Sequence, residues 1–227
     1  VKGVPELLSL EITVDSSTAP LSTIFFTTLP PNLTKLAICN FSLPPDAEVM
    51  QQLPSQLQWL EIPMSFTQET ISALPRHLTC LKARVIPPTE IGPEEVACLP
   101  PTLTSLHTDL LQLLPGAGAL LPPLLRSLLV DTGGPDSYPY EIVNAIGYNP
   151  TSSSETDFKR ELLPSSLTNF VCTDHRPEFM MPVLPDGLTR LDWGWMRIHP
   201  KMPLNLPNSL LDLTVTLNDI RVHDWKS

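Results

Sequence analysis

The eight residues LPPNLTKL, at positions 29–36, carry the pattern Leu-Pro-x-x-Leu-x-x-Leu that organises this chain. The Leu-Pro pair that opens the pattern returns at positions 53, 74, 99, 121, 163, 184 and 206, and leucines or one phenylalanine follow at the same two positions each time. Successive pairs are therefore 24, 21, 25, 22, 42, 21 and 22 residues apart. A degenerate copy opens at Pro5. A repeat of this length is the sequence signature of a solenoid.

In most copies an apolar residue also lies two positions after the last leucine, as at Ile38 and Ile62, and Thr108 holds that position in one copy. Alternate side chains of a strand point to opposite faces, so Leu-x-x-Leu-x-Ile predicts a short strand with one apolar face. One strand cannot bury that face alone, and stacked copies give a parallel sheet over one continuous core. The proline ahead of each strand fixes φ and lacks an amide donor, so it fits the turn that leads into the strand.

Short helices are predicted between the strands, over residues 45–52, 67–73 and 93–98, where apolar residues recur three or four positions apart in a polar background. The residues placed to act as helix N-caps are Asp46, Thr67 and Gly92.

This arrangement resembles the leucine-rich-repeat superfamily. Its Leu-Pro opening is most similar to the proline-containing subtype of bacterial secreted effectors and of slime-mould and amoebal repeat proteins, and the resemblance extends from about Pro5 to Asn218. It implies a single α/β domain over residues 1–227, a curved solenoid of nine or ten repeats with a parallel β-sheet on the concave face and short helices or 3-10 turns on the convex side. Only Asn218 matches the asparagine that the family uses in its turns, so we expect the other turns to be satisfied differently.

Composition limits the classes of partner. Hydrophobic residues make up 42% of the chain, which is enough for a packed core. A net charge of −10 repels phosphate backbones, so we expect no nucleic-acid partner. No run approaches the roughly 18 apolar residues that a membrane-spanning helix needs. We therefore expect a monomer that binds a protein and does not bind a membrane.

Cysteine usage favours a cytoplasmic location. The four cysteines form no Cys-x-x-Cys pair, and we expect reduced, mostly buried thiols. The cysteine-rich end caps usual in extracellular members of the family are absent from this sequence. Glycosylation sequons at Asn32 and Asn40 leave a secreted or extracellular domain open, as does the chance that the chain is a piece of a longer protein.

The step of 42 residues leaves 131–162 as either an irregular repeat or an insertion. The segment contains all three tyrosines of the protein, Tyr138, Tyr140 and Tyr148. Tyrosines on a protruding loop are good anchors for a protein partner. The alternative is that the segment packs on the convex side and its rings cover the core.

The candidate contacts on the concave face are residues of the types that most often contribute binding energy, or that carry charge, at outward strand positions. They are Trp59, Lys82, Arg84, His107 and Arg190. For each one, the alternative is an ordinary solvated position on the sheet.

Catalytic and metal-binding motifs are not found. The sequence has no His-Glu-x-x-His, no phosphate-binding loop and no nucleophile elbow, so we expect no catalytic residues, no metal and no cofactor. The effector-type resemblance carries no ligase activity, because no separate catalytic domain accompanies the repeats. The leading hypothesis is a non-catalytic recognition module, which could be the sensing part of a larger protein. The alternatives are a structural scaffold whose partner covers the convex side or the ends, and an enzyme whose site lies in 131–162.

Overall fold

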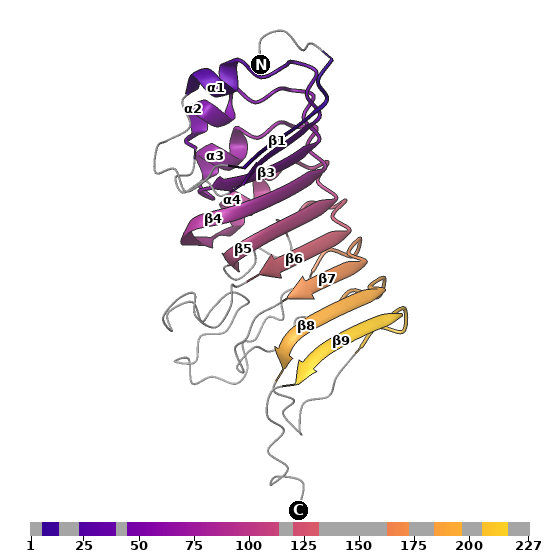
Figure 1. The fold of residues 1–227 in the computed structure, drawn as a ribbon. Coiled ribbons are helices and arrows are strands. Elements are labelled where there is room, and N and C mark those ends of the chain that lie inside the picture. Colours follow the sequence, from indigo (N-terminus) through magenta and orange to yellow (C-terminus); the bar gives the residue numbers. More distant parts are fainter. Residues whose placement is uncertain are drawn as a thin grey trace, which may run out of the picture.

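The computed structural model describes residues 6–13, 23–39, 45–113, 120–131, 163–172, 184–196 and 206–217. Within these ranges, nine strands form one sheet in which every neighbouring pair is parallel and the spatial order follows the sequence order. The chain therefore winds as a solenoid, one strand per coil, as the repeat predicts (Figure 1). The strands are β1 Ser9–Thr13, β2 Lys35–Cys39, β3 Trp59–Met64, β4 Cys80–Ile91, β5 Ser105–Leu113, β6 Ser127–Asp131, β7 Asn169–Cys172, β8 Arg190–Met196 and β9 Asp212–Leu217.

The Leu-Pro-x-x-Leu pattern is a β-turn. In the first clean copy, the amide of Leu33 donates a hydrogen bond of 3.1 Å to the carbonyl oxygen of Pro30, three residues earlier. The same bond, at 3.0–3.1 Å, closes the turn in all seven later copies. Proline is suited to the first turn position because only its carbonyl is needed there, and its missing amide costs nothing. This confirms the predicted role of the proline.

Directly after each turn, one carbonyl of the preceding coil receives a cluster of hydrogen bonds. The carbonyl oxygen of Thr79 accepts from the amides of Thr104 and Ser105, at 2.8 and 3.0 Å, and from the hydroxyl of Thr104, at 3.0 Å. The two amide bonds recur between all nine coils, and the hydroxyl bond recurs wherever threonine follows the second leucine of the Leu-Pro-x-x-Leu pattern. We call this series the carbonyl ladder. Its acceptors are the carbonyls of Leu8, Thr34, Gln58, Thr79, Thr104, Arg126, Thr168 and Thr189.

Four short helices connect the first five strands: α1 Thr23–Thr27, α2 Ala47–Met50, α3 Gln68–Ser72 and α4 Pro93–Ala97. They stack along one side of the sheet, near the ends at which the strands finish (Figure 1). The three predicted N-caps are confirmed. The carboxylate of Asp46 accepts from the amide of Val49 at 2.9 Å, Thr67 forms a reciprocal capping box with Thr70, and the amide of Gly92 donates to the Glu95 carboxylate. The hydroxyl of Thr70 also donates to the carbonyl of Ser65, which satisfies a turn where the family would use asparagine.

The core lies between the sheet and the helices. The inward leucines of the central strands, such as Leu60, Leu81 and Leu106, are at most 1% exposed, and the helices add Val49 and Ile71 to the same cluster. Trp193 belongs to the core: it is 2% exposed and packs edge-to-face on Phe170, with ring centroids 5.8 Å apart. The side chain of its neighbour Trp195 lies outside the described residues.

Two irregularities interrupt the repeat. Strands β4 and β5 extend beyond the standard length and regain their pairing after a register shift between Arg84 and Thr89. Strand β6 pairs directly with β7, Ser127 opposite Asn169, so no other strand lies between them in the sheet. The irregular repeat or insertion predicted for 131–162 lies outside the described residues, apart from Asp131.

Two adjacent leucines of one turn provide a matched test of the core. Leu125 is fully buried, whereas Leu124 is 55% exposed. We expect Leu125→Ala to lower the free energy of unfolding by about 2–5 kcal/mol, because it removes a buried side chain and leaves a cavity. Leu124→Ala should cost less than about 1 kcal/mol. Urea denaturation followed by circular dichroism measures both, and equal losses would contradict this core.

The carbonyl ladder can be tested by removing one hydroxyl. Thr104→Val keeps the size and branching of the side chain but deletes its bond to the Thr79 carbonyl. We expect a loss of about 1 kcal/mol in the free energy of unfolding, the usual net value of one hydrogen bond. Thr168→Val should lose less, because Thr168 is more exposed and its bond to the Arg126 carbonyl is longer, at 3.2 Å. The same denaturation experiment decides, and a Thr104→Val protein as stable as the wild type would count against a structural role for the hydroxyls.

Candidate functional site

The face of the sheet that points away from the core, here called the open face, is built from the outward side chains of successive strands. Because the register is constant, these side chains line up in rows that run across the strands. The first row is Ser9, Lys35, Trp59, Cys80, Ser105, Ser127, Asn169, Arg190 and Asp212. The second row is Glu11, Ala37, Glu61, Lys82, His107, Leu129, Val171, Asp192 and Thr214.

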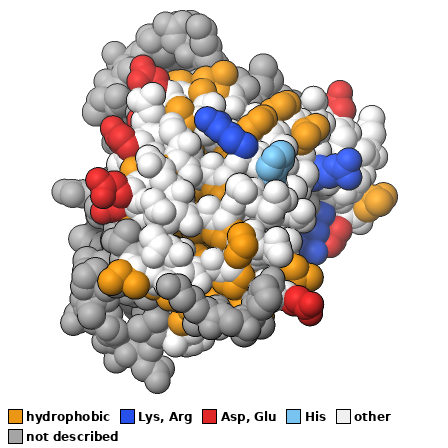
Figure 2. Space-filling view, turned by 90° about the horizontal axis from the view of Figure 1, so that it is seen from above, with side chains coloured by type: hydrophobic (Ala, Val, Ile, Leu, Met, Phe, Trp, Pro, Cys, Tyr) orange, Lys and Arg blue, Asp and Glu red, His pale blue; other side chains and the backbone are white. Residues whose placement is uncertain are grey.

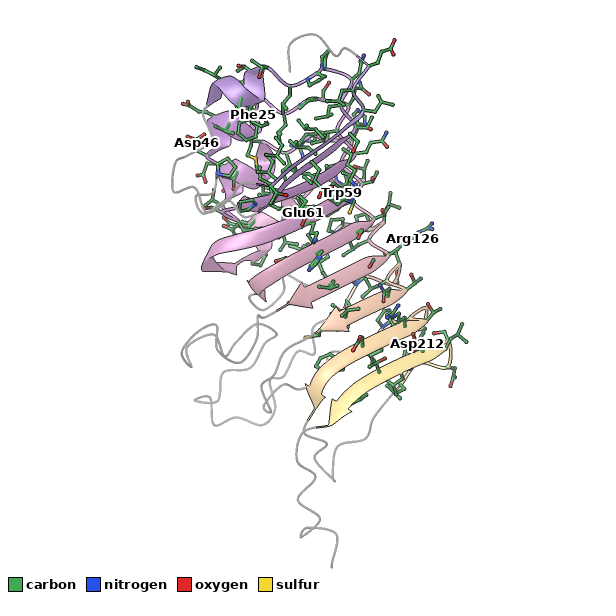
Figure 3. The ribbon with its side chains drawn as sticks, viewed as in Figure 1. Phe25, Asp46, Trp59, Glu61, Arg126 and Asp212 are labelled. Atoms are coloured by element: carbon green, nitrogen blue, oxygen red, sulfur yellow. The ribbon has the colours of Figure 1, made fainter. Side chains whose placement is uncertain are left out.

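Over β2, β3 and β4, side chains in both rows contact side chains of the neighbouring strand. In the first row, the ammonium group of Lys35 lies 4.5 Å from the centre of the Trp59 ring, within the range of a cation–π interaction. In the second row, Nζ of Lys82 and Oε1 of Glu61 form an ion pair at 2.7 Å. Trp59 and Glu61 project from the same strand, β3 (Figure 3). We call these four side chains the Trp59 patch.

The Trp59 patch is tightly surrounded. Ala37 belongs to the second row and points away from the core, yet it is only 2% exposed. Lys82 and Glu61 are themselves 40% and 23% exposed. The patch therefore combines a partly exposed tryptophan, two amines and one carboxylate on the open face.

Two thiols border the patch, and both have a raised pKa. Burial is the main cause at Cys39, and the carboxylates of Glu61 and Glu11 raise the pKa further because they disfavour a nearby thiolate. Burial is also the main cause at Cys80, where a hydrogen bond to Ser105 partly offsets it. None of the four cysteines forms a disulfide, but only Cys172 is buried, so the expectation of mostly buried thiols was wrong.

The structure brings together three of the five predicted contacts. Trp59, Lys82 and His107 lie on the consecutive strands β3, β4 and β5, with Lys82 and His107 directly opposite each other. Arg190 lies on β8, four strands from Lys82, which is about 19 Å at the usual strand spacing. Its Nε forms an ion pair of 3.5 Å with Asp212 on the next strand, so it belongs to a separate region.

The remaining predicted contacts are only partly described. The backbone of Arg84 lies in β4 opposite Asp109, but its side chain is outside the described residues. Tyr138, Tyr140 and Tyr148 lie wholly outside them. Their proposed part in binding therefore stays a prediction.

Charge is distributed unevenly around the coil. The helices and their caps carry carboxylates at Asp46, Glu48, Glu69, Glu94 and Glu95, and no Lys, Arg or His occurs in α1–α4. In the view down the solenoid, some acidic side chains lie along the left edge, which is the helix side, and others lie on the right beside lysines and arginines (Figure 2). The Trp59 patch itself contains two lysines and one glutamate, so it is a mixed-charge region.

Within the described part of the chain, no three His, Cys, Asp or Glu side chains come together as a metal site would require. None of the described helices has the length and apolar character needed to cross a lipid bilayer.

Comparison with known proteins gives a likeness of fold alone. No protein-family model and no curated protein matches this sequence. Among solved structures, the chain is similar to CroV588, described as a novel circular LRR protein, with a TM-score of 0.44 and 20% sequence identity. The similarity covers 82% of this chain and 31% of that protein, so this chain spans about a third of its length. The leucine-rich-repeat-like fold assigned here rests on the parallel register and the repeat itself, and the proline-containing subtype stays a prediction.

Sequence analysis did not identify Lys35 and Glu61 as members of the site. Both occupy outward strand positions, and aligning the repeats places Lys35 opposite Trp59 and Glu61 opposite Lys82. Aligning the repeats would therefore have predicted both contacts. The two residues were missed because the prediction treated each strand separately and did not compare it with its neighbours across the sheet.

The patch can be probed through its thiols. The raised pKa of Cys39 means less thiolate at a given pH, so we expect alkylation by iodoacetamide to be slower than for an ordinary thiol, with its pH profile shifted upward. Glu61→Gln should lower the pKa of Cys39 and speed its alkylation, because the substitution removes a negative charge and releases Lys82. Cys80 should change less, since burial dominates its shift. Peptide mass spectrometry measures each site, and an unchanged rate at Cys39 would place Glu61 too far away.

Proposed function

We propose that this protein is a non-catalytic module that binds another protein through the open face, with Trp59 as the central contact. The observation that supports this most is the arrangement of Trp59, which is partly exposed on a rigid sheet and restrained by Lys35 at 4.5 Å. Tryptophan is among the residues that most often dominate the energy of protein interfaces.

Preorganisation supports the same proposal. Lys35 is restrained by the Trp59 ring and Lys82 by the Glu61 carboxylate, and both contacts join neighbouring strands. Side chains that are already ordered lose less conformational entropy when a partner binds. A partner that covers the patch also excludes water from the ion pair, which strengthens polar contacts made at its rim.

The partner that suits the patch is a protein with an apolar or aromatic group for Trp59 and polar groups of both signs around it. His107 extends the site along the second row, and Arg84 is proposed to extend it along β4. Arg190, with Asp212, is proposed as a separate contact at the far end of the open face. The tyrosines of 131–162 are proposed as a further contact, from a segment that begins at the end of β6.

The test compares capture of proteins from a native cell extract by the intact chain and by a Trp59→Ala, Lys82→Glu variant. Arg126→Glu is the matched control, because it reverses a charge on the exposed turn edge, away from the patch (Figure 3). A partner identified in this way is purified, and its dissociation constant is measured against all three proteins. We expect the patch variant to bind about tenfold more weakly or worse, as for loss of a dominant interface residue.

All three proteins must first give the same circular dichroism spectrum and thermal midpoint. Equal affinity of the patch variant and the intact chain would contradict recognition through Trp59. Weakening by Arg126→Glu alone would move the site to the turn edge.

A further inference from the structure

The basic side chains of the open face differ in what neutralises them. In its first two rows, the lysines and arginines whose side chains are described are Lys35, Lys82 and Arg190. Lys82 pairs with the Glu61 carboxylate at 2.7 Å, and Arg190 pairs with the Asp212 carboxylate at 3.5 Å. Within the described part of the chain, Lys35 has no carboxylate at ion-pair distance, and its ammonium group contacts the Trp59 ring instead.

The ammonium group of Lys35 lies over β3, although Lys35 itself belongs to β2. Its Nζ is 4.5 Å from the centre of the Trp59 ring. Lys82 reaches β3 from the other side, because it belongs to β4 and its Nζ contacts Glu61. Trp59 and Glu61 both project from β3 (Figure 3). Two ammonium groups and one carboxylate therefore meet over one strand, which leaves the Trp59 patch with one uncompensated positive charge.

One further carboxylate is described in the first two rows over β1–β4, but it lies on the wrong side of Lys35. Glu11 projects from β1, opposite Ala37 on β2. Strands β1 and β3 are two strand spacings apart, or about 10 Å. Because the Lys35 ammonium group lies over β3, Glu11 is not placed to neutralise it.

A partner that covers the Trp59 ring also covers the Lys35 ammonium group, because the two are in contact. Removing a charged group from water is costly unless new hydrogen bonds or an opposite charge replace the water. An ammonium group has three N–H donors, and the ring lies on only one side of it. The covering partner therefore has to supply an acceptor, and a charged acceptor makes the stronger hydrogen bond.

We propose that the Trp59 patch binds a protein segment in which an aspartate or glutamate lies beside an aromatic or aliphatic residue. The carboxylate pairs with Lys35, the apolar side chain packs on Trp59, and the ion pair of Lys82 with Glu61 stays intact beside them. The patch extends from β2 to β4, about 10 Å, which is the length of about three extended residues. A short segment can therefore make both contacts. This inference rests on the proposed function, because it names the partner of the same site.

A side-chain carboxylate fits the patch better than other common anions of proteins. It carries one negative charge and balances the one uncompensated positive charge. A phosphate group carries nearly two, and its excess would lie beside the Glu61 carboxylate. A terminal carboxylate is usually captured by a nest of backbone amides. Strands β2, β3 and β4 are each paired on both sides, so the sheet already engages their amides.

The test begins with a displayed library of short random peptides, selected on the chain of 227 residues. Peptides that also bind Trp59→Ala are discarded, so those that remain require Trp59. We expect aspartate or glutamate beside an aromatic or aliphatic residue to be enriched among them. One such peptide is synthesised in three forms, with its acidic residue, with the corresponding amide, and with phosphoserine at that position.

Dissociation constants are measured by calorimetry, with Lys35→Gln and Lys35→Arg as the decisive variants. We expect Lys35→Gln to bind the acidic peptide about tenfold more weakly or worse, as for loss of a charge-assisted hydrogen bond. Lys35→Arg should keep most of the affinity, because arginine retains the charge and stacks on aromatic rings. The amide peptide should bind the intact chain more weakly and should lose little more with Lys35→Gln. If Lys35 only restrained the Trp59 ring, Lys35→Gln would weaken both peptides equally.

Glu11→Gln is the matched control, because it removes a charge from the same face, two strands away from Trp59. Its affinity for the acidic peptide should be unchanged or higher. Weaker binding would contradict the proposal, because Glu11 would then take part in the site.

Failure of this inference can be distinguished from failure of the proposed function. Three results would overturn carboxylate recognition and leave binding through Trp59 in place: selected peptides without an acidic residue, equal binding of the acidic peptide to Lys35→Gln and the intact chain, or tighter binding of the phosphoserine form. A library that gives no peptide dependent on Trp59 would also overturn it, whereas the extract experiment would still decide whether a folded protein binds there.

Discussion

The structure depends on one recurring interaction, the carbonyl that accepts two amides and, in most coils, a threonine hydroxyl from the next coil. At this point the chain leaves the proline turn and enters the strand, so one set of bonds fixes both the turn and the start of the register. Buried apolar surface supplies a driving force that has no direction. The carbonyl ladder adds direction, because only a coil displaced by one strand spacing brings its amides onto that oxygen. The proline turn prepares the geometry by closing onto its own carbonyl before the strand begins.

The fold could be predicted from the sequence because its determinants are local and repeated. Leucines at fixed offsets specify the inward row, and proline specifies the turn, as the bonds from Leu33 to Pro30 and from Leu103 to Pro100 confirm. The N-caps followed from single residues such as Asp46. The lengthening of β4 and β5 was not predictable, since the tract from Arg84 to Ile91 contains two prolines and breaks the pattern on which the prediction relied. Threonine occurs at the ladder position in five copies. Its hydrogen bond to the preceding coil was not predicted, because the family pattern assigns this kind of role to an asparagine at a different position.

The candidate site was less predictable because it depends on contacts between pairs of residues on neighbouring strands. Trp59, Lys82 and His107 were identified from residue type and outward position. The restraint of Trp59 by Lys35 and of Lys82 by Glu61 is a property of neighbouring strands and appears only when the register is known. The backbone bonds and the inward leucines hold all nine coils together, whereas the contacts of the patch join only β2, β3 and β4. Outward residues are therefore free to serve recognition, and a repeat fold of this kind does not by itself specify what is recognised.

The order of the sheet has a mechanical meaning. Within the described ranges, each strand pairs only with its neighbours in the sequence, so no described strand closes the sheet by pairing with one from far along the chain. A protein pulled by its two ends would therefore not resist as one body. It would peel from a terminus, one coil after another, with each event releasing the length of a single repeat while the remaining coils keep their carbonyl bonds. The coils are mechanically in series, so the least stable coil sets the force at which unfolding begins.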